Sequence, residues 1–443
     1  MIGEAFATPG EDVGTVLDEL LATTSDGRFF ERFEALSGRF VLIVMKDGFQ
    51  RVLHDAIGSR SVYYRIGTEP CLASHAELVA SAYGHGRSAD AAAILASEEY
   101  RSRTVKYLPG DLTVYENVHG LSPNSYYDIA DRQTVRYWPR EPRRPAGFDR
   151  FAGVIDGHLE ALAVHLAGRD PILGISGGID TRMLIAAFRA HELPFHGVTW
   201  LRRKGGVAQR ELEIVESVIA HTGPEHTFLD LSKINDELRQ LATLAKRNAG
   251  RFGKPSRITA HMLHVGADPR AVFIRGYGAE IVRGFYNLPS GSSRRAPKRR
   301  GLRRQMGRLL PASPPRPVAV EEPDPAELLR AYDSSMRVDP GAEHVRLGLA
   351  AFTGFAERAS FDDDLTRFGF DLSDLFYWEH RMGMWGSAKH NEMDPAVLSI
   401  AGFNSRPMYE AAFGLGSEER LTKELLARVI AGYDEALARI PYL

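Results

Sequence analysis

One short segment of the chain holds residue types that together bind phosphate. It follows an apolar run of strand length, residues 171–176, and consists of Ser176, Gly177, Gly178, Ile179, Asp180 and Thr181. Glycines let the backbone turn tightly and present N–H groups, and the helical pattern that follows favours anions at its start. The hydroxyls of Ser176 and Thr181 can donate to phosphate oxygens, and the Asp180 carboxylate suits Mg²⁺. The pattern predicts a nucleotide-phosphate site, and the plainer alternative is a tight turn without a ligand.

Two further segments hold candidate residues. Tyr277 and Glu280 lie at the end of a predicted strand, residues 272–278, within the segment Gly276-Tyr277-Gly278-Ala279-Glu280. Glu379 stands among large apolar and aromatic residues, where an acid needs a partner or a function. The alternatives are a packed aromatic ring for Tyr277 and, for Glu379, a pairing with Arg381 or His380 on an exposed helix face.

The phosphate segment resembles the SGG-x-D-S/T loop of N-type ATP pyrophosphatases, which cleave ATP to AMP and pyrophosphate. Residues 276–280 resemble the Gly-Glu-Gly-Ser-Asp segment of asparagine synthetases and, through Tyr277, the Gly-Tyr-Gly-x-Asp segment of β-lactam and carbapenam synthetases. The resemblance implies that ATP and Mg²⁺ are used, with Asp180 and Glu280 as metal ligands. It also implies that adenine lies against the backbone near Val198 and Gly276. Glutamate is one methylene longer than the family's aspartate at position 280, which alters the metal geometry.

The same resemblance assigns a catalytic pair. Tyr277 corresponds to the tyrosine of a Tyr–Glu dyad that deprotonates the attacking amine in these cyclases. Residues 375–387 resemble the helix that follows, and Glu379 falls at the matching place. A tyrosine with a pKa of about 10 needs such a partner to act as a base near neutral pH.

The first 140 residues are predicted to form a β-rich, glutaminase-like domain. Residues 36–84 and 116–129 resemble the N-terminal domain of the same family. Working members carry a cysteine directly after the initiator methionine, whereas this chain has Ile2, and we expect the first strand of the domain to be missing. A degenerate N-terminal-nucleophile (Ntn) type domain without glutaminase activity is therefore expected. Strands are predicted at 39–45, 50–56, 61–64 and 112–115, with a helical stretch at 87–100.

A linker at 138–145 separates this domain from a second one, residues 149–443, where strands and helices alternate. Alternation of this kind predicts an α/β fold with a doubly wound parallel sheet, as in adenine nucleotide alpha hydrolases, followed by C-terminal helices from about residue 326. Strands are predicted at 171–176, 195–201, 226–231 and 272–278, and helices at 149–167, 181–192 and 211–223.

Residues 288–325 form a basic, proline-rich insertion with eight lysines and arginines between Arg294 and Arg308. A solvated surface insertion is the plain interpretation, and a basic arm for an acidic peptide, carrier protein or nucleic acid is the alternative. Because aromatic residues are not interleaved with these charges, nucleic acid is not expected.

Composition excludes several classes of protein. A formal net charge of −2 attracts neither nucleic acid nor a membrane surface, and one cysteine, Cys71, excludes a disulfide framework. Neither a signal peptide nor an apolar run of about 18 residues is found, so a cytoplasmic protein without a membrane contact is expected.

The predicted activity is ATP-dependent amide formation without glutamine, on a small molecule or peptide that supplies a carboxylate and an amine. The family's C-terminal lysine has no clear counterpart: the sequence ends at Ile440-Pro441-Tyr442-Leu443, and neither Lys389 nor Lys423 can be assigned its role. Two alternatives remain, a non-catalytic scaffold with a decayed synthetase fold and a tRNA-modifying pyrophosphatase. The substrate's identity and the oligomeric state, a homo-oligomer included, are left open.

Overall fold

The computed structural model describes most of the chain. The described residues are 1–7, 10–24, 28–46, 48–201, 206–233, 236–250, 257–265, 268–287, 324–332, 341–421 and 423–443. Of the predicted basic insertion, residues 288–323 lie outside this part. Within the described residues, none of the helices combines the length and the apolar character needed to span a bilayer.

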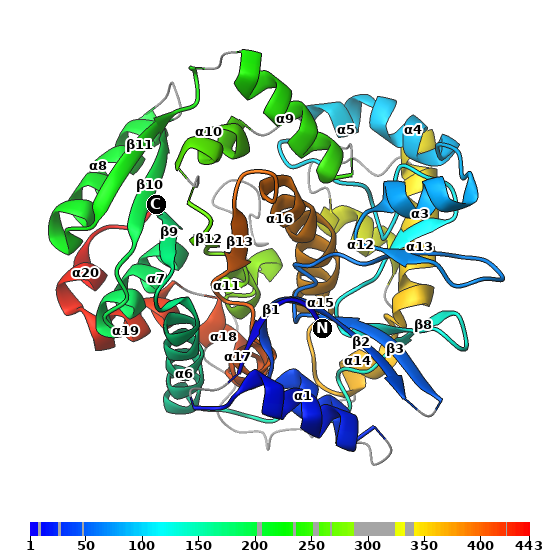
Figure 1. Cartoon of the computed structure of the whole chain (residues 1–443), viewed down its shortest axis with the longest axis horizontal. Helices are drawn as coiled ribbons and strands as arrows, with labels where there is room; N and C mark the ends of the chain where they lie inside the picture. Colours follow the sequence, from blue (N-terminus) through cyan, green and yellow to red (C-terminus); the bar gives the residue numbers. More distant parts are fainter. Residues whose placement is uncertain are drawn as a thin grey trace, which may run out of the picture.

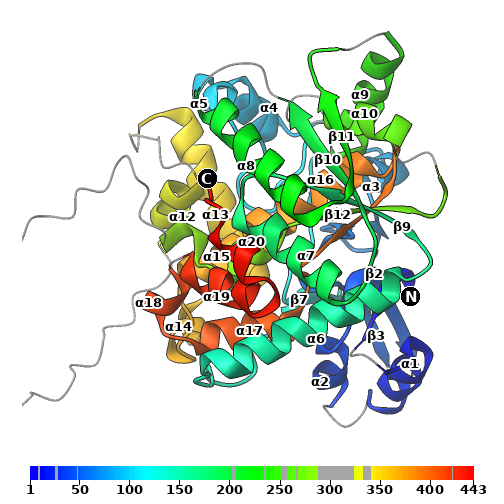
Figure 2. The same ribbon diagram turned by 90° about the vertical axis from the view of Figure 1, so that its left-hand side faces the viewer.

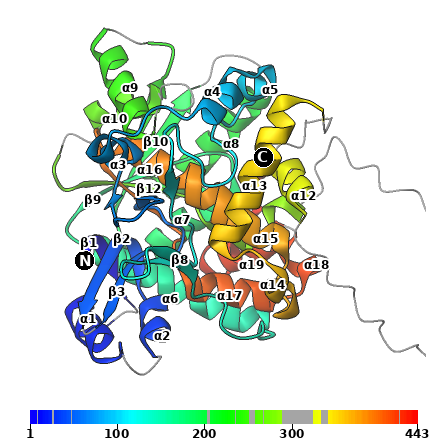
Figure 3. The ribbon, with the colours of Figure 1, turned by 90° about the vertical axis from the view of Figure 1, so that its right-hand side faces the viewer.

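The N-terminal part is built on antiparallel sheets, as predicted (Figure 3). The larger sheet has the strand order β1-β2-β3-β7-β8, and the smaller one has the order β5-β4-β6. The strands are β1 (Ile2–Phe6), β2 (Ser37–Lys46), β3 (Phe49–His54), β4 (Tyr63–Arg65), β5 (Leu72–Ala73), β6 (Val118–Gly120), β7 (Ser125–Asp128) and β8 (Gln133–Arg136). The helices of this part are α1 (Val13–Ala22), α2 (Phe29–Glu34), α3 (Ala76–Tyr83), α4 (Ala89–Ala96) and α5 (Glu98–Ser102).

Two predictions for this part are wrong. The first strand is present: β1 pairs antiparallel with β2, with Ile2 opposite Val41. Gly3 and Glu4 hide it in the sequence, because they interrupt its apolar pattern. The strand predicted at 112–115 is instead a turn with isolated bridges, because the Thr113 hydroxyl accepts the Tyr115 N–H and so competes with strand pairing.

The second part contains a five-stranded, entirely parallel sheet in the order β11-β10-β9-β12-β13 (Figure 1). Its strands are β9 (Asp170–Gly174), β10 (His196–Leu201), β11 (Glu225–Asp230), β12 (Ala271–Arg275) and β13 (Leu398–Ala401). From β9 the chain first proceeds to one side of the sheet and later returns to the other through β12. The order therefore reverses between β9 and β12, and ligands bind at this point in open α/β sheets.

Helices cover both faces of this sheet, which confirms a doubly wound α/β arrangement (Figure 2). Alternate residues of a strand face opposite sides, so Leu173 packs in the cluster with Ile155 and Met183, whereas Ile172 packs with Met262 and Met393. The first face carries α6 (Phe148–Leu166), α7 (Ile179–Ala190), α8 (Gly206–Thr222) and α19 (Glu424–Tyr433), and the second carries α10 (Arg257–Val265) and α16 (Ser387–Met393).

The remaining helices surround this unit, in accord with the predicted helical C-terminal region. They are α9 (Asp236–Asn248), α11 (Ala279–Val282), η1 (Phe285–Asn287), α12 (Pro325–Tyr332), α13 (Glu343–Ala359), α14 (Asp363–Arg367), α15 (Leu372–Phe376), η2 (Tyr377–Gly386), α17 (Arg406–Gly414), α18 (Ser417–Arg420) and α20 (Glu435–Arg439). The segment η2 is a π-helix, a form often found at functional sites.

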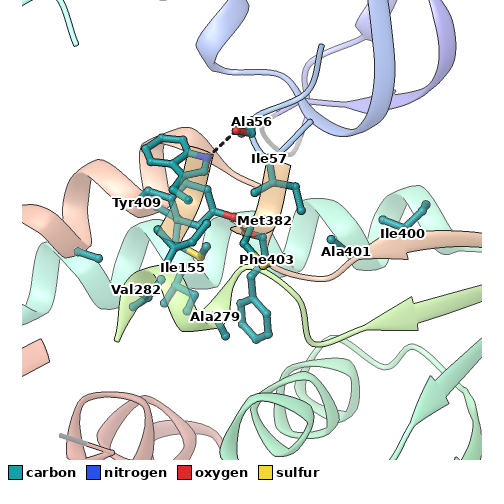
Figure 4. Close-up of a cluster of buried hydrophobic side chains, with 14 of the residues drawn as sticks. Ala56, Ile57, Ile155, Ala279, Val282, Met382, Ile400, Ala401, Phe403 and Tyr409 are labelled. Atoms are coloured by element: carbon teal, nitrogen blue, oxygen red, sulfur yellow. Dashed lines mark hydrogen bonds between the residues drawn. The ribbon is translucent and has the colours of Figure 1, made fainter. Parts of the chain in front are cut away.

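The N-terminal part packs tightly on the rest of the chain. One hydrophobic cluster includes residues of both parts, and Ala56 and Ile57 lie beside Met382 and Tyr409 (Figure 4). Trp378 donates its indole N–H to the Ala56 carbonyl oxygen at 2.7 Å. The interface is therefore a continuous core.

Glu379 is the polar centre of this interface. Its carboxylate is fully buried and accepts two hydrogen bonds from the Arg136 guanidinium, at 2.7 and 2.6 Å, and one from the Asn124 amide at 2.8 Å. Arg136 lies in β8 of the N-terminal part, so the ion pair links the two parts of the chain.

Removing one partner of this pair should destabilise the fold. For Arg136→Met we expect the free energy of unfolding, measured by chemical denaturation, to fall by about 3–5 kcal/mol, because the Glu379 charge stays buried. The control is Arg239→Met, which breaks an exposed pair with Asp236 and should change it by less than about 1 kcal/mol. Equal effects of the two substitutions would contradict the structural role of Glu379.

Candidate active site

The predicted phosphate segment is the loop between β9 and α7, directly at the reversal of strand order. Hydroxyl groups hold it together: the Ser176 and Thr181 oxygens lie 3.2 Å apart, and the Gly178 N–H donates to the Ser176 hydroxyl at 3.3 Å. The 12-residue helix α7 begins at Ile179, so its first N–H groups point towards the loop. The structure thus places all the predicted loop residues at the start of one helix.

The loop after β12 crosses close to this helix. A Cβ atom at Gly276 would lie only 3.2 Å from the Asp180 Cβ and 3.5 Å from the Thr181 backbone nitrogen. Gly278 has a φ of +98°, and a Cβ there would approach the Phe403 carbonyl oxygen to 2.6 Å. Glycine is therefore required at position 278, whereas a side chain at position 276 would press on Asp180. The segment after β12 brings Glu280 close to Asp180.

Asp180 and Glu280 form a pair of partly buried carboxylates. Asp180 Oδ1 and Glu280 Oε2 are buried and have no hydrogen-bond partner within the described residues. Burial raises the pKa of Asp180, and burial together with the neighbouring Asp180 charge raises the pKa of Glu280 to about 7. Unpartnered carboxylate oxygens of this kind are costly to bury, so they indicate a site for a cation.

Two cations already face Asp180. Arg283 donates from Nη2 to Asp180 Oδ2 at 2.7 Å, and its guanidinium charge counteracts the rise in the pKa of Asp180 that burial causes. The Lys423 ammonium also lowers the pKa of Asp180, more weakly. Lys423 therefore lies near the loop, although its place in the sequence was not enough to assign it the role of the family's C-terminal lysine.

Tyr277 lies among aromatic and charged side chains. Its ring is 5.4 Å from that of Trp385 and 5.7 Å from that of His390, and the Arg275 guanidinium lies over it at 4.3 Å. Burial raises the pKa of Tyr277, Arg275 lowers it, and the charges of Glu280 and Glu392 raise it again.

Glu392, in α16, is the carboxylate near Tyr277 that the sequence interpretation missed. It is 3% exposed, its Oε2 pairs with Lys389, and its Oε1 is buried without a partner within the described residues. A signal existed, since Glu392 follows Lys389 by three residues in a helical run, but the same spacing is common on exposed helix faces.

The structure does not bring Glu379 to Tyr277. Both Glu379 oxygens are bound by Arg136 and Asn124 in the interface described above. The predicted Tyr277–Glu379 dyad is therefore wrong. The alternative is wrong as well, because Glu379 is fully buried and does not pair with Arg381 or His380 on an exposed face.

Val198 lies in the middle of β10, where its side chain is fully buried against α10. Its carbonyl oxygen accepts the Ile175 N–H at 2.8 Å, so it belongs to the sheet pairing beside the loop. The position of adenine near Val198 and Gly276 stays a prediction.

The last residues of the described chain cover the phosphate loop. The Leu443 N–H donates to the Gly177 carbonyl oxygen at 3.1 Å, and the Leu443 side chain lies against Gly177. The buried Arg182 holds this tail, residues 440–443, by donating to the Pro441 carbonyl at 2.8 Å and stacking on the Tyr442 ring at 4.2 Å. The C-terminal mark in Figure 1 lies beside β9 and β10 accordingly.

No family model and no curated protein matches this chain. Among solved structures it is similar in part to the NMN synthetase from Francisella tularensis, with a TM-score of 0.21 and 10% sequence identity. The likeness covers 31% of this chain and 58% of the other, so the chain spans less than two thirds of the length of the structure it matches. At this TM-score the likeness bears on neither the fold nor the reaction of the chain.

Proposed function

We propose that this chain uses ATP and Mg²⁺ to adenylate a carboxylate and then joins the activated acyl group to an amine. The observation that carries the proposal is the carboxylate pair of Asp180 and Glu280 beside a hydroxyl-lined glycine loop, in which each acid has one buried oxygen without a partner among the described residues. This combination lies at the carboxyl ends of two adjacent central strands, where nucleotide sites are built in such sheets.

The loop fits a nucleotide's phosphates. Ser176 and Thr181 offer hydroxyls, Gly177 offers a backbone N–H group, and α7 adds the favourable field of its first turn. Asp180 and Glu280 would hold Mg²⁺, which neutralises charge on a pyrophosphate leaving group. Groups of three or more histidine, cysteine or acidic side chains able to hold a metal are absent from the described residues. A metal on Asp180 and Glu280 would complete its coordination with water and phosphate oxygens.

The resemblance of residues 176–181 and 276–280 to the asparagine synthetase family supports adenylation as the reaction. A carboxylate oxygen is a very poor leaving group, and transfer of AMP to it solves that problem. The carboxylate attacks the α-phosphorus, pyrophosphate leaves, and the amine then displaces AMP from the acyl-adenylate. The amine comes from ammonia, a second molecule, or the same molecule, which gives a lactam, and a role in natural-product biosynthesis fits this chemistry.

For the second step we propose Tyr277 and Glu392 as the groups that take the proton from the amine. Burial keeps the Tyr277 hydroxyl protonated at neutral pH, so it needs a carboxylate that can accept a proton. Glu392 has such an oxygen, the unpartnered Oε1, and its charge acts on Tyr277.

Product analysis of ATP turnover tests the proposal. With Mg²⁺ and a panel of amino acids and amino-carboxylates, we expect AMP and pyrophosphate rather than ADP and phosphate. ADP formation would contradict adenylation, and a failure to bind ATP at all would favour the scaffold alternative.

Asp180→Ala should abolish the first step. We expect at least a 100-fold loss of pyrophosphate–ATP exchange, because the substitution removes a metal ligand. Asp170→Ala, at the start of β9 and so at the other end of that strand from the phosphate loop, should leave the exchange rate unchanged. Unchanged exchange in a folded Asp180→Ala protein would show that this loop does not bind the nucleotide.

Tyr277→Phe and Glu392→Gln should separate the two steps. Each should lower the rate of amide formation by about 100-fold or more while pyrophosphate–ATP exchange continues, because general base catalysis acts after adenylation. The control is Tyr127→Phe, which removes a buried hydroxyl in the N-terminal part and should affect neither rate. Normal amide formation in Glu392→Gln would remove Glu392 from the mechanism.

A further inference from the structure

Arg283 is an arginine buried at the centre of the candidate site. The residue is 8% exposed, its Nη2 donates to Asp180 Oδ2 at 2.7 Å, and its Nε is buried without a partner within the described residues. A guanidinium has five N–H donors in a rigid fork, and within the described residues the hydrogen bond to Asp180 occupies one of them while Nε has no partner.

The short helix α11 explains why Arg283 reaches this place. Ala279, Ile281 and Val282 are buried in the hydrophobic core, whereas Glu280 and the capping residue Arg283 carry the charges. Residues three apart lie on the same face of a helix, so Glu280 and Arg283 both face Asp180. The turn after β12 therefore brings both an acid and a base to the loop.

The two carboxylates of this cluster keep oxygens that no donor reaches. Arg283 and, more weakly, Lys423 act on Asp180, but the buried Asp180 Oδ1 and Glu280 Oε2 have no hydrogen-bond partner in the described part of the chain. A divalent cation placed on those two oxygens would make the cluster positive. The site then offers an anion both the metal and the unused donors of Arg283, which favours a polyphosphate.

We propose that Arg283 is a phosphate-binding residue of this site, which holds Asp180 in place while the site is empty and donates to a pyrophosphate oxygen when nucleotide is bound. The inference rests on the proposed function, because it assumes that the loop takes the phosphates of ATP. Arg283 thus supplies positive charge that does not depend on the metal. It also competes with the metal for Asp180 until phosphate draws the guanidinium away.

Binding measurements on the full chain separate this role from a purely structural ion pair. Inorganic pyrophosphate is titrated by calorimetry into protein in EDTA, and Mn²⁺ alone is titrated and followed by electron paramagnetic resonance. For Arg283→Met we expect metal-free pyrophosphate affinity to fall by about ten- to a hundredfold, the size of a lost charge-assisted hydrogen bond. Mn²⁺ should bind more tightly, because Asp180 Oδ2 is released.

The matched control is Arg358→Met. It breaks another arginine–aspartate pair, in which Asp111 is 3% exposed, away from the loop, and it should change neither affinity. The unfolding temperatures of Arg283→Met and Arg358→Met show how much stability each protein loses with its ion pair, so that a loss of stability can be told apart from a loss of binding. If Arg283→Met does not fold, Arg283→Gln removes the charge but keeps a donor for Asp180, and the same losses are expected.

The proposal would be overturned if folded Arg283→Met or Arg283→Gln bound pyrophosphate in EDTA with an affinity within twofold of wild type. So would wild-type protein that binds Mg·ATP but no pyrophosphate in EDTA. The two proposals fail separately: if pyrophosphate binds through Arg283 but no acid stimulates AMP formation, adenylation falls and the role of Arg283 stands.

Discussion

The candidate site depends on the close approach of two loops at the centre of the parallel sheet. Gly276 lies against the first turn of α7, at a spacing that leaves no room for a side chain without movement of Asp180 or Thr181. Because β9 and β12 are neighbours in the sheet, their carboxyl ends meet there. As a result Asp180 in α7 meets Arg283, the capping residue of α11, although about 100 residues separate them in the chain.

Bringing two acids together in a buried place has an electrostatic cost, and the surrounding residues show how the protein limits it. Burial favours the protonated form of both Asp180 and Glu280. Arg283 offsets part of this effect on Asp180, and Lys423 adds a weaker contribution. At the interface, by contrast, both oxygens of Glu379 accept hydrogen bonds from Arg136 or Asn124. This acid has a structural role, whereas Asp180 and Glu280 each keep an oxygen without a partner among the described residues, as expected of a site that binds a ligand.

Local pattern was enough to predict the strands and helices around the phosphate loop, because strand, glycine turn and helix follow one another directly. It failed where partners come from far along the chain. Strand β13 is a short apolar run after helices, and only its pairing with β12 makes it a strand. Likewise, the choice between Glu379 and Glu392 depends on which acid meets Arg136 across an interface, and periodicity within one helix holds no information about that.

The tail, residues 440–443, lies over Gly177 of the phosphate loop. Arg182 in α7 donates hydrogen bonds to the backbone carbonyls of residues 440 and 441, and the Leu443 side chain lies against Gly177. Anything joined to Leu443 would begin beside Gly177, so an affinity tag or fusion protein attached there would lie against the glycine loop that we propose as the phosphate site.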